Sequence, residues 1–208
     1  MVAVAKERDE PAAVTFITSA DDSAFVARLR ADDRIAIGAL FDRHADRIER
    51  VLYRVLGVDA EIPDLLQDVF VYAMTGIAKY RGDDGNLAAW LTRIAVAVAR
   101  KCIRRRVTRR FLGLRTPGEL PDWPGTEDPE MQTLLRRAYA VLERLPARER
   151  IPFALRHLEG MQLVEVAEAC DTSLATTKRR LATARVRFER LAARDPLLCE
   201  WLRGEASA

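Results

Sequence analysis

The sequence predicts an all-α protein made of two small helical domains joined by a flexible linker. Apolar residues recur every three or four positions along the 208-residue chain, and the alternating apolar pattern of strands is absent. Between the two halves, prolines and glycines crowd together and acidic residues replace basic ones, as in a linker. We expect the domains at 33–106 and 129–194, with an extension at 1–32, the linker at 107–128 and a tail at 195–208.

Composition excludes several classes of protein. With 49% hydrophobic and 31% charged residues, the chain can bury a core beneath a heavily charged surface. No apolar run approaches the ~20 residues of a membrane-spanning helix, and the N-terminus is charged, unlike a signal peptide. Three widely spaced cysteines and two histidines form neither a disulfide framework nor a metal site. We expect a cytoplasmic protein that has no metal or cofactor and does not insert into a membrane.

Three helices account for the first domain. An apolar face over 37–55 predicts one helix, which Gly57 ends. The second helix opens near Pro63, because proline suits the first turn of a helix. The third starts after the polar turn at 81–86, where Asn86 is expected to act as its cap. Each helix carries an apolar stripe that it cannot bury alone, so the three form one domain.

The second domain begins at residues 128–130, which supply a helix cap, a first-turn proline and a first-turn acid. Pro146 ends that helix. Inside a helix Pro152 would cost roughly 3 kcal/mol. We therefore expect the next helix to begin near Arg150, with Pro152 in its first turn.

The two ends of the chain carry weaker signals. Residues 1–30 are either an unstructured tail or hold a short helix at 22–31. The C-terminal tail is too short for a domain of its own. Its apolar residues Leu197, Leu198 and Trp201 are expected to pack back on the second domain.

The distribution of charge says more than the net value of +3. Between 93 and 115 there are nine basic residues and no acid, and between 174 and 194 there are seven basic residues and one acid. Two separate basic blocks on a nearly neutral chain indicate two contacts with a polyanion.

The strongest local pattern is that of a helix-turn-helix. A short helix at 163–170 meets a polar turn at 171–173, and Ser173 caps a second, basic helix. Asp171 stands where a glycine is common and can adopt the left-handed conformation. The apolar contacts that would lock the two helices come from Val166, Ala167, Leu174, Thr177 and Leu181. The alternative is two packed helices with a solvated basic face.

Two further patterns each have an ordinary structural interpretation. The run from Tyr80 to the arginines at 104–106 sets aromatic residues beside cations, which suits unstacked single-stranded bases. However, Trp90 lies on the apolar stripe and is expected in the core, and arginines are common at helix C-termini. Asp64, Gln67 and Asp68 form an acidic outward face, which by itself is usually just solvated.

In their order along the chain these pieces resemble an extracytoplasmic-function (ECF) sigma factor. Region 2 is matched by DLLQDVF at 64–70, YRG at 80–82, WLxxIA at 90–95 and RRR at 104–106. Region 4 is matched by LPARER at 145–150, LRHLEG at 155–160 and SLATTKRRL at 173–181. The resemblance covers roughly residues 33 to 192.

The resemblance implies a bacterial transcription initiation factor that is not an enzyme. Its expected partners are core RNA polymerase, through the β′ clamp helices and the β flap, promoter DNA, and an anti-sigma factor wedged between the two domains. Polymerase contact is implied for Asp64, Gln67 and Asp68. Contact with the −10 element is implied for Tyr80, Arg81, Asn86, Arg93, Arg100, Lys101, Arg104 and Arg105. In the −35 element, bases would face Lys178, Arg179 and Ala182, phosphates would face Arg180 and Arg185, and Ser173 and Thr176 would lie at the helix start.

The sequence departs from the family at several points. Ala97 and Lys101 stand where relatives usually carry Asn and Asp, and Lys101 favours a phosphate contact. Ala175 replaces a common glycine and should firm the recognition helix. Two rival functions remain: a stand-alone helix-turn-helix regulator, which would normally dimerise on a palindrome, and a helical adaptor that binds only proteins.

Overall fold

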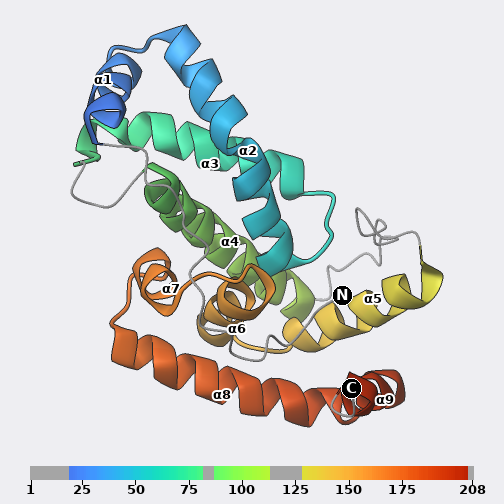
Figure 1. Cartoon of the computed structure of the whole chain (residues 1–208). Helices are drawn as coiled ribbons and strands as arrows, with labels where there is room; N and C mark the ends of the chain where they lie inside the picture. The colour runs from blue at the N-terminus through green and yellow to red at the C-terminus, as the bar shows by residue number, and fades with distance from the viewer. Residues whose placement is uncertain (1–18, 82–86, 113–127, 206–208) are drawn as a thin grey trace.

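The computed structural model describes residues 19–81, 87–112 and 128–205, and over these the chain forms helices and no strand. Two groups of helices follow one another along the chain (Figure 1). The first unit consists of α1 (Ser19–Arg30), α2 (Arg34–Leu56), α3 (Ile62–Gly76), the 3-10 turn η1 (Ile77–Lys79) and α4 (Leu87–Phe111). The second unit consists of α5 (Pro129–Leu142), α6 (Ala147–Phe153), the π-helical η2 (Ala154–Leu158), α7 (Leu163–Ala169), α8 (Leu174–Ala192) and α9 (Pro196–Glu205).

The all-α prediction is confirmed, and the ends of the helices are set by the expected kinds of residue. The Asp33 carboxylate caps α2 by accepting hydrogen bonds from the backbone N–H groups of Ile35 at 2.9 Å and Ala36 at 3.3 Å. Gly57 ends α2 with a φ of 79°, as a glycine after a helix commonly does. Asn86, the expected cap of α4, lies outside the described residues. α4 itself continues to Phe111, into the stretch expected as linker.

The start of α6 corrects one expectation. We placed the helix start near Arg150, but α6 begins at Ala147, and Pro152 lies inside it. Proline cannot donate the N–H bond that an α-helix would send to the carbonyl of Arg148. The helix tolerates this loss because Pro152 and its neighbours are buried in the core, and directly afterwards it widens into η2. There Glu159 N donates to Ala154 O at 3.0 Å, a five-residue step.

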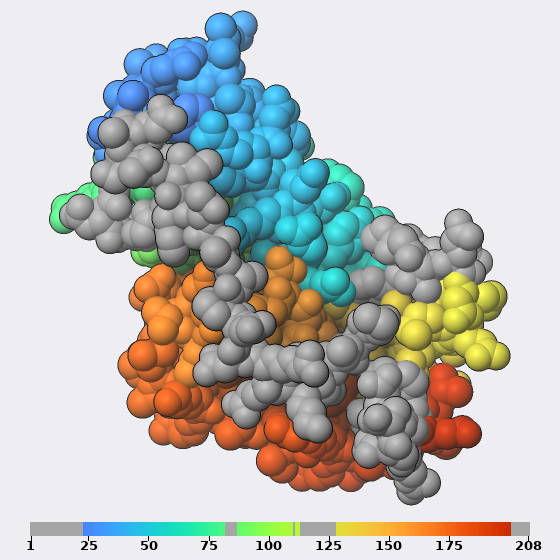
Figure 2. All heavy atoms as spheres, in the orientation of Figure 1, coloured from blue at the N-terminus to red at the C-terminus, as the bar shows by residue number. Residues whose placement is uncertain are grey.

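The two units share one core. Ile151, Leu155 and Val166 of the second unit belong to the same cluster of buried side chains as the residues inside α2, α3 and α4. A smaller cluster joins α5, α8 and α9, and contains Leu198 of the C-terminal tail as expected, whereas Leu197 is exposed and the side chain of Trp201 lies outside the described part. α6 and α7 accordingly lie directly against α4, and the space-filling view shows the two units in contact (Figures 1 and 2).

The N-terminal extension contains a helix. A short helix near residues 22–31 is confirmed as α1 (Ser19–Arg30), which packs on α2. Among the described helices, none is both long enough and apolar enough to cross a membrane.

Candidate nucleic-acid interface

The helix-turn-helix is built by α7, a short turn and α8. Asp171 adopts the left-handed conformation expected of it, with a φ of 53°. The Ser173 hydroxyl accepts a hydrogen bond from Thr176 N at 3.2 Å and so caps α8. The hydroxyls of Thr172 and Thr177 lie 2.8 Å apart, and Thr177 is fully buried. The turn is therefore tied to the recognition helix by one buried hydroxyl pair.

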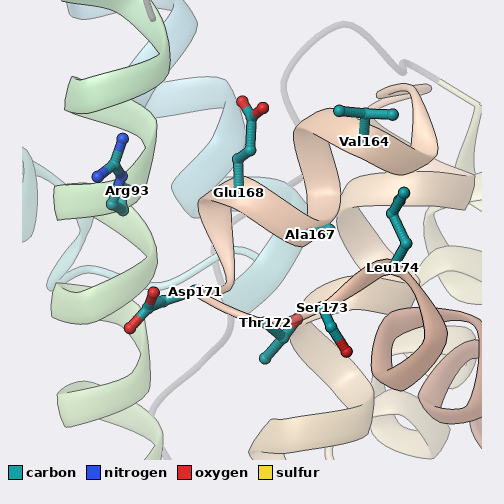
Figure 3. Close-up of a pocket in the computed structure, with 8 residues that line it drawn as sticks. All are labelled: Arg93, Val164, Ala167, Glu168, Asp171, Thr172, Ser173 and Leu174. Carbon is teal, nitrogen blue, oxygen red and sulfur yellow. The ribbon is translucent and has the colours of Figure 1, made fainter. Parts of the chain in front are cut away.

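One of the residues expected to lock the two helices, Leu174, is not buried between them. Val166, Ala167 and Thr177 are buried between the helices, but Leu174 is 44% exposed. Leu174 is the first residue of α8, and its side chain lines an open pocket together with Val164 and Ala167 of α7 (Figure 3).

The N-terminal half of α8 presents its basic residues to solvent. Lys178, Arg179 and Ala182 are exposed, whereas Arg180 and Thr176 are half-buried. Arg185 is also exposed, and its hydrogen bond to Glu189 at 2.9 Å raises the pKa of its guanidinium. The residues expected to face bases are thus those that the fold leaves accessible.

Arg187 has a different role from its basic neighbours. Its Nη1 lies 2.7 Å from the carboxylate of Glu149, whose side chain is almost completely buried. This ion pair fixes α8 on α6. Sequence patterning alone counted Arg187 among the solvated basic residues.

The aromatic residues near the −10 surface are packed inside. Tyr80 is 3% exposed, and its ring centroid lies 5.1 Å from that of Trp90 in a tilted pair. Trp90 is in the core as expected, but an exposed Tyr80 side chain able to stack on a base is ruled out in this arrangement. Arg81, directly after it, is exposed. The polar turn that follows lies outside the described residues.

The basic residues of α4 divide into two sets. Lys101 and Arg104 are exposed, and Lys101 Nζ lies 3.3 Å from the Tyr72 hydroxyl. Arg93 and Arg100 are half-buried where α4 meets the second unit, and Arg100 Nη2 donates to the carbonyl of Cys170 at 3.2 Å. Two of the residues assigned to the −10 element therefore face the helix-turn-helix.

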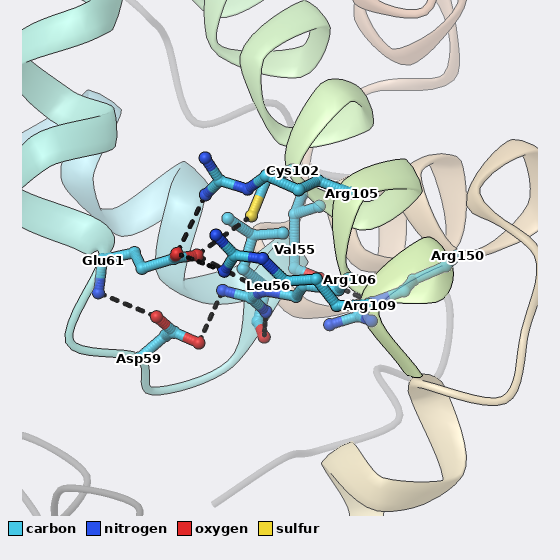
Figure 4. Close-up of polar contacts among 9 residues, drawn as sticks. All are labelled: Val55, Leu56, Asp59, Glu61, Cys102, Arg105, Arg106, Arg109 and Arg150. Carbon is cyan, nitrogen blue, oxygen red and sulfur yellow. Dashed lines mark hydrogen bonds and ion pairs between the residues drawn. The ribbon is translucent and has the colours of Figure 1, made fainter. Parts of the chain in front are cut away.

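Figure 4 shows a feature that sequence reasoning missed, an acid pair among the arginines at the end of α4. Glu61 Oε1 lies 2.9 Å from Arg105 Nη2 and 3.4 Å from Arg109 Nη1, and Asp59 Oδ2 lies 2.6 Å from Arg106 Nη2. These partners are more than 40 positions apart, so no local pattern announces them.

The acidic face of α3 lies as expected. Asp64, Gln67 and Asp68 are exposed, whereas the neighbouring Leu65 and Val69 are buried. The apolar side chains of Val71 and Tyr72 continue the same exposed strip, at 52% and 44% exposure. An acidic surface with accessible apolar groups is suited to binding another protein.

An open pocket of about 540 Å³ lies between α4 and the helix-turn-helix. Arg93 of α4 lines one side, and α7, the turn and the start of α8 line the other (Figure 3). Asp171 points toward α4, and Ser173 and Leu174 border the same space. Arg93, one of the residues assigned to the −10 element, thus borders the same space as Ser173 at the start of the recognition helix.

Hydrogen bonds at the end of α2 hold the two units together. Three successive carbonyls there accept side-chain donors: Arg54 O from Tyr139 Oη at 3.2 Å, Val55 O from Arg150 Nε at 2.7 Å, and Leu56 O from Arg106 Nη1 at 3.4 Å. Tyr139 and Arg150 belong to the second unit. The carbonyls at the end of α2, which lack partners within the helix, are therefore satisfied mostly from the other unit.

Burial shifts the pKa values of Arg150 and Tyr139. It lowers the pKa of Arg150 to about 10 and raises the pKa of Tyr139 to about 12. Both groups remain protonated at neutral pH and act as donors. Within the described residues, no group of three or more His, Cys, Asp or Glu side chains is placed to hold a metal ion.

Comparison with known families matches both halves of the chain. The family described as Sigma-70 region 2 matches residues 40–109, and the family described as Sigma-70, region 4 matches residues 135–188. Together the two matches cover more than half of the chain, in the order that the sequence motifs indicated.

Individual relatives match across both regions. The chain is 27% identical over 184 residues to the ECF RNA polymerase sigma-E factor of Haemophilus influenzae, covering 81% of this chain and 93% of that one. It is 25% identical over 174 residues to the protein of the same name from Escherichia coli strain K12, covering 79% and 90%.

Two solved structures share the fold. The structure of CnrH in complex with the cytosolic domain of CnrY has a TM-score of 0.60 at 23% identity, covering 84% of this chain and 98% of that one. The sigma factor RpoE from Bartonella quintana, solved in complex with the anti-sigma factor NepR, has a TM-score of 0.51 at 19% identity, covering 84% and 96%.

Proposed function

The chain belongs to the ECF RNA polymerase sigma factors, and we propose how its surfaces divide the work of that family. As a sigma factor it has no catalytic chemistry of its own. It binds core RNA polymerase and directs it to specific promoters, where region 4 reads the −35 element and region 2 opens the −10 element. The assignments that follow name the residues for each of these contacts.

The exposed, capped start of α8 carries the functional assignment. Lys178, Arg179 and Ala182 face outward from a recognition helix in a helix-turn-helix, the geometry that places side chains against base edges in the major groove. Arg180 and Arg185 supply phosphate contacts on either side of that surface. The Ser173 hydroxyl caps the helix by accepting a hydrogen bond from Thr176 N, which keeps the start of the helix in place.

The −10 surface is formed by Arg81 and Asn86 with the basic residues of α4. Flipping a base out of the duplex costs a few kcal/mol, which contacts with the pocket and the phosphates offset. In this assignment Arg93, Arg100, Lys101, Arg104 and Arg105 bind the backbone of the strand. Tyr80 contributes as a buried support for α4, since its ring packs on Trp90.

Polymerase binding is assigned to the exposed acidic residues of α3. Asp64, Gln67 and Asp68 are the contact to the β′ clamp helices, and the neighbouring apolar side chains of Val71 and Tyr72 extend that contact. The second unit contacts the β flap, as in the family. A protein that makes these contacts would work in the cytoplasm, with the polymerase.

In the structure the second unit packs directly against the first, an arrangement that we call closed. This closed arrangement has to open before both promoter elements are bound. The names of the two elements place them about 25 base pairs apart, which is about 85 Å of B-DNA. A compact chain of this length has a radius of gyration of only about 17 Å. Binding to core polymerase therefore has to separate the first and second units, which also frees Arg93 and Arg100 from the contact between them.

An anti-sigma factor would act on the same equilibrium. The two structurally similar proteins were solved in complexes, one with the cytosolic domain of CnrY and one with an anti-sigma factor. We assign to this chain an anti-sigma partner that wedges between the two units, where Arg93 faces the start of α8. Such a partner would keep both DNA surfaces covered.

Co-elution with core polymerase tests the proposal. Asp64→Lys combined with Asp68→Lys should abolish a complex that the unchanged protein forms, because it reverses the charge of the α3 face. Asp42→Lys combined with Asp46→Lys is the matched control, since these two acids are also exposed and four residues apart, but on α2. Equal loss in both double variants would contradict the α3 assignment, and no complex with the unchanged protein would contradict the polymerase role.

A further inference from the structure

We propose that Asp59 and Glu61 act as built-in counter-ions that weaken the affinity of the α4 arginines for nucleic acid. The inference rests on the proposed function in one respect, namely that the end of α4 contacts DNA. It adds a specificity device: the protein carries its own competitor for the phosphates, and this competitor limits binding to DNA away from promoters.

The two carboxylates are held in place by the backbone before α3. Glu61 N donates to Asp59 Oδ1 at 2.7 Å, and Ile62 N donates to Asp59 O at 3.1 Å. Glu61 itself is followed at once by the first turn of α3, where Leu65 N donates to its carbonyl at 2.9 Å. The acids are therefore a fixed part of the first unit, directed at the end of α4 (Figure 4).

The charges nearly balance at this point. Three guanidinium groups, those of Arg105, Arg106 and Arg109, meet two carboxylates. Partial burial raises the pKa of Glu61, but the charges of Arg105 and Arg106 lower it more, so the net shift is downward and the carboxylate is ionised at neutral pH. By formal charge, the two carboxylates leave the cluster a single net positive charge in place of three.

Two of the three arginines can exchange partners. The side chains of Arg105 and Arg109 are 47% and 54% exposed, and Glu61 between them is 33% exposed. Ion pairs at such exposure are weak in water, so a phosphate group can replace the carboxylate. Arg106 is 20% exposed and also bonds to Leu56 O, so it stays in place and supports the end of α2.

The acid pair should matter most where binding is least specific. Non-specific binding to DNA is supplied almost entirely by phosphate contacts, which release counter-ions. A carboxylate that must be displaced from Arg105 and Arg109 reduces that contribution on every sequence. At a promoter the polymerase and the −35 contact also hold the protein in position. Their binding free energy offsets the cost of displacing the carboxylate.

Titration of a fluorescent single-stranded oligonucleotide with the full-length protein at several salt concentrations tests the inference. Glu61→Gln keeps the size of the side chain and should tighten binding roughly three- to tenfold at low salt, the range expected for losing exposed ion pairs. The plot of log affinity against log salt should become steeper by about 0.7 for each phosphate gained. The control Asp42→Asn removes an equal charge from an exposed site on α2 and should change affinity less.

A second pair of changes separates this inference from the proposed function. Arg105→Gln with Arg109→Gln should weaken binding, and adding Glu61→Gln to that background should give no gain. If the arginine changes weaken binding but Glu61→Gln alone has no effect, the counter-ion role is wrong and the DNA surface stands. If the arginine changes have no effect, the assignment of this surface to DNA is itself wrong. An equal gain from Asp42→Asn would reduce the effect to net charge and also overturn the inference.

Discussion

Arg150 Nε donates a hydrogen bond of 2.7 Å to the carbonyl of Val55, across 95 positions of sequence and between the two helical units. The guanidinium is buried where the negative end of the α2 dipole lies, so its charge is partly compensated there. Together with Tyr139 and Arg106 it satisfies three neighbouring carbonyls. This group of hydrogen bonds, which we call the α2 lock, holds the closed arrangement.

Arg150→Met should weaken the α2 lock. The change keeps much of the side-chain volume but leaves the carbonyl of Val55 without its charged donor, at a cost of about 1.5–3 kcal/mol. We expect a lower midpoint of thermal unfolding and a larger radius of gyration by small-angle scattering. Arg148→Met is the control, because Arg148 is 73% exposed on the same helix. An unchanged radius of gyration would show that the lock does not set the closed arrangement.

The pH dependence of stability should report on Tyr139. Burial raises its pKa to about 12, from 10.0 in the unfolded chain. The folded state therefore holds this proton more tightly, so the contribution to stability is complete below pH 10 and is lost as the pH rises toward 12. Over that interval the unchanged protein should lose roughly 1–3 kcal/mol relative to Tyr139→Phe. Chemical unfolding at pH 9 and pH 11.5 measures this difference, and parallel curves for the two proteins would contradict it.

Gly57→Ala should destabilise the packing of Tyr139 against the end of α2. Gly57 has a φ of 79°, and a Cβ added there would lie 2.9 Å from Cδ1 of Tyr139. Backbone strain of about 1–3 kcal/mol is expected, together with displacement of the tyrosine ring. Gly38→Ala is the matched control inside α2, where a Cβ meets nothing within 4 Å and should stabilise the helix by about 0.5–1 kcal/mol. Opposite signs for the two variants in thermal unfolding are the expected result.

Lys178→Ala and Arg179→Ala should each relax the preference for the −35 sequence. A side chain that reads a base contributes about 1–3 kcal/mol of discrimination, so the ratio between preferred and altered elements should fall at least severalfold. Competition between promoter variants, measured with polymerase bound, gives this ratio. Arg190→Ala, an exposed arginine near the other end of α8, should leave the ratio unchanged. An equal loss of affinity on all sequences would reassign Lys178 or Arg179 to phosphates.

Arg30→Met should loosen the segment that leads to the −10 surface. Arg30 Nη2 donates to the carbonyl of Tyr80 at 2.5 Å, and its Nε lies 3.5 Å from the carbonyl of Ile77, so α1 caps the end of η1. We expect faster hydrogen exchange of the backbone amides at 77–81 and less promoter opening, with polymerase binding retained. Arg28→Met, on the same helix and paired with Asp33, is the comparison.

The sequence predicted well those features that depend on near neighbours. The Ser173 cap, the left-handed Asp171, the outward face of Asp64 and Asp68 and the buried Trp90 all follow from residues within one or two helical turns. The helix-turn-helix could therefore be placed to within a residue or so.

What could not be predicted depends on pairs far apart in the chain. Glu61 and Arg105 are 44 positions apart and Arg150 and Val55 are 95 apart, so neither pair leaves a periodic signal. Pro152 was misjudged because its propensity cost is local, whereas the burial that offsets it comes from tertiary packing. The same limit explains why the core shared by the two units was not predicted.

The α2 lock also gives the protein a threshold for engaging the transcription machinery. A ligand that binds only a minor conformation has its apparent affinity divided by the population of that conformation. If the lock favours the closed form by about 2.8 kcal/mol, roughly one molecule in a hundred is open at equilibrium. Competition with other initiation factors for a limited pool of polymerase would then depend on the free-energy difference between the closed and open forms. It would depend on this difference as much as on the acidic face of α3 that binds the polymerase. Substitutions in Tyr139 or Arg150 would change how much of this protein a cell needs before its promoters respond.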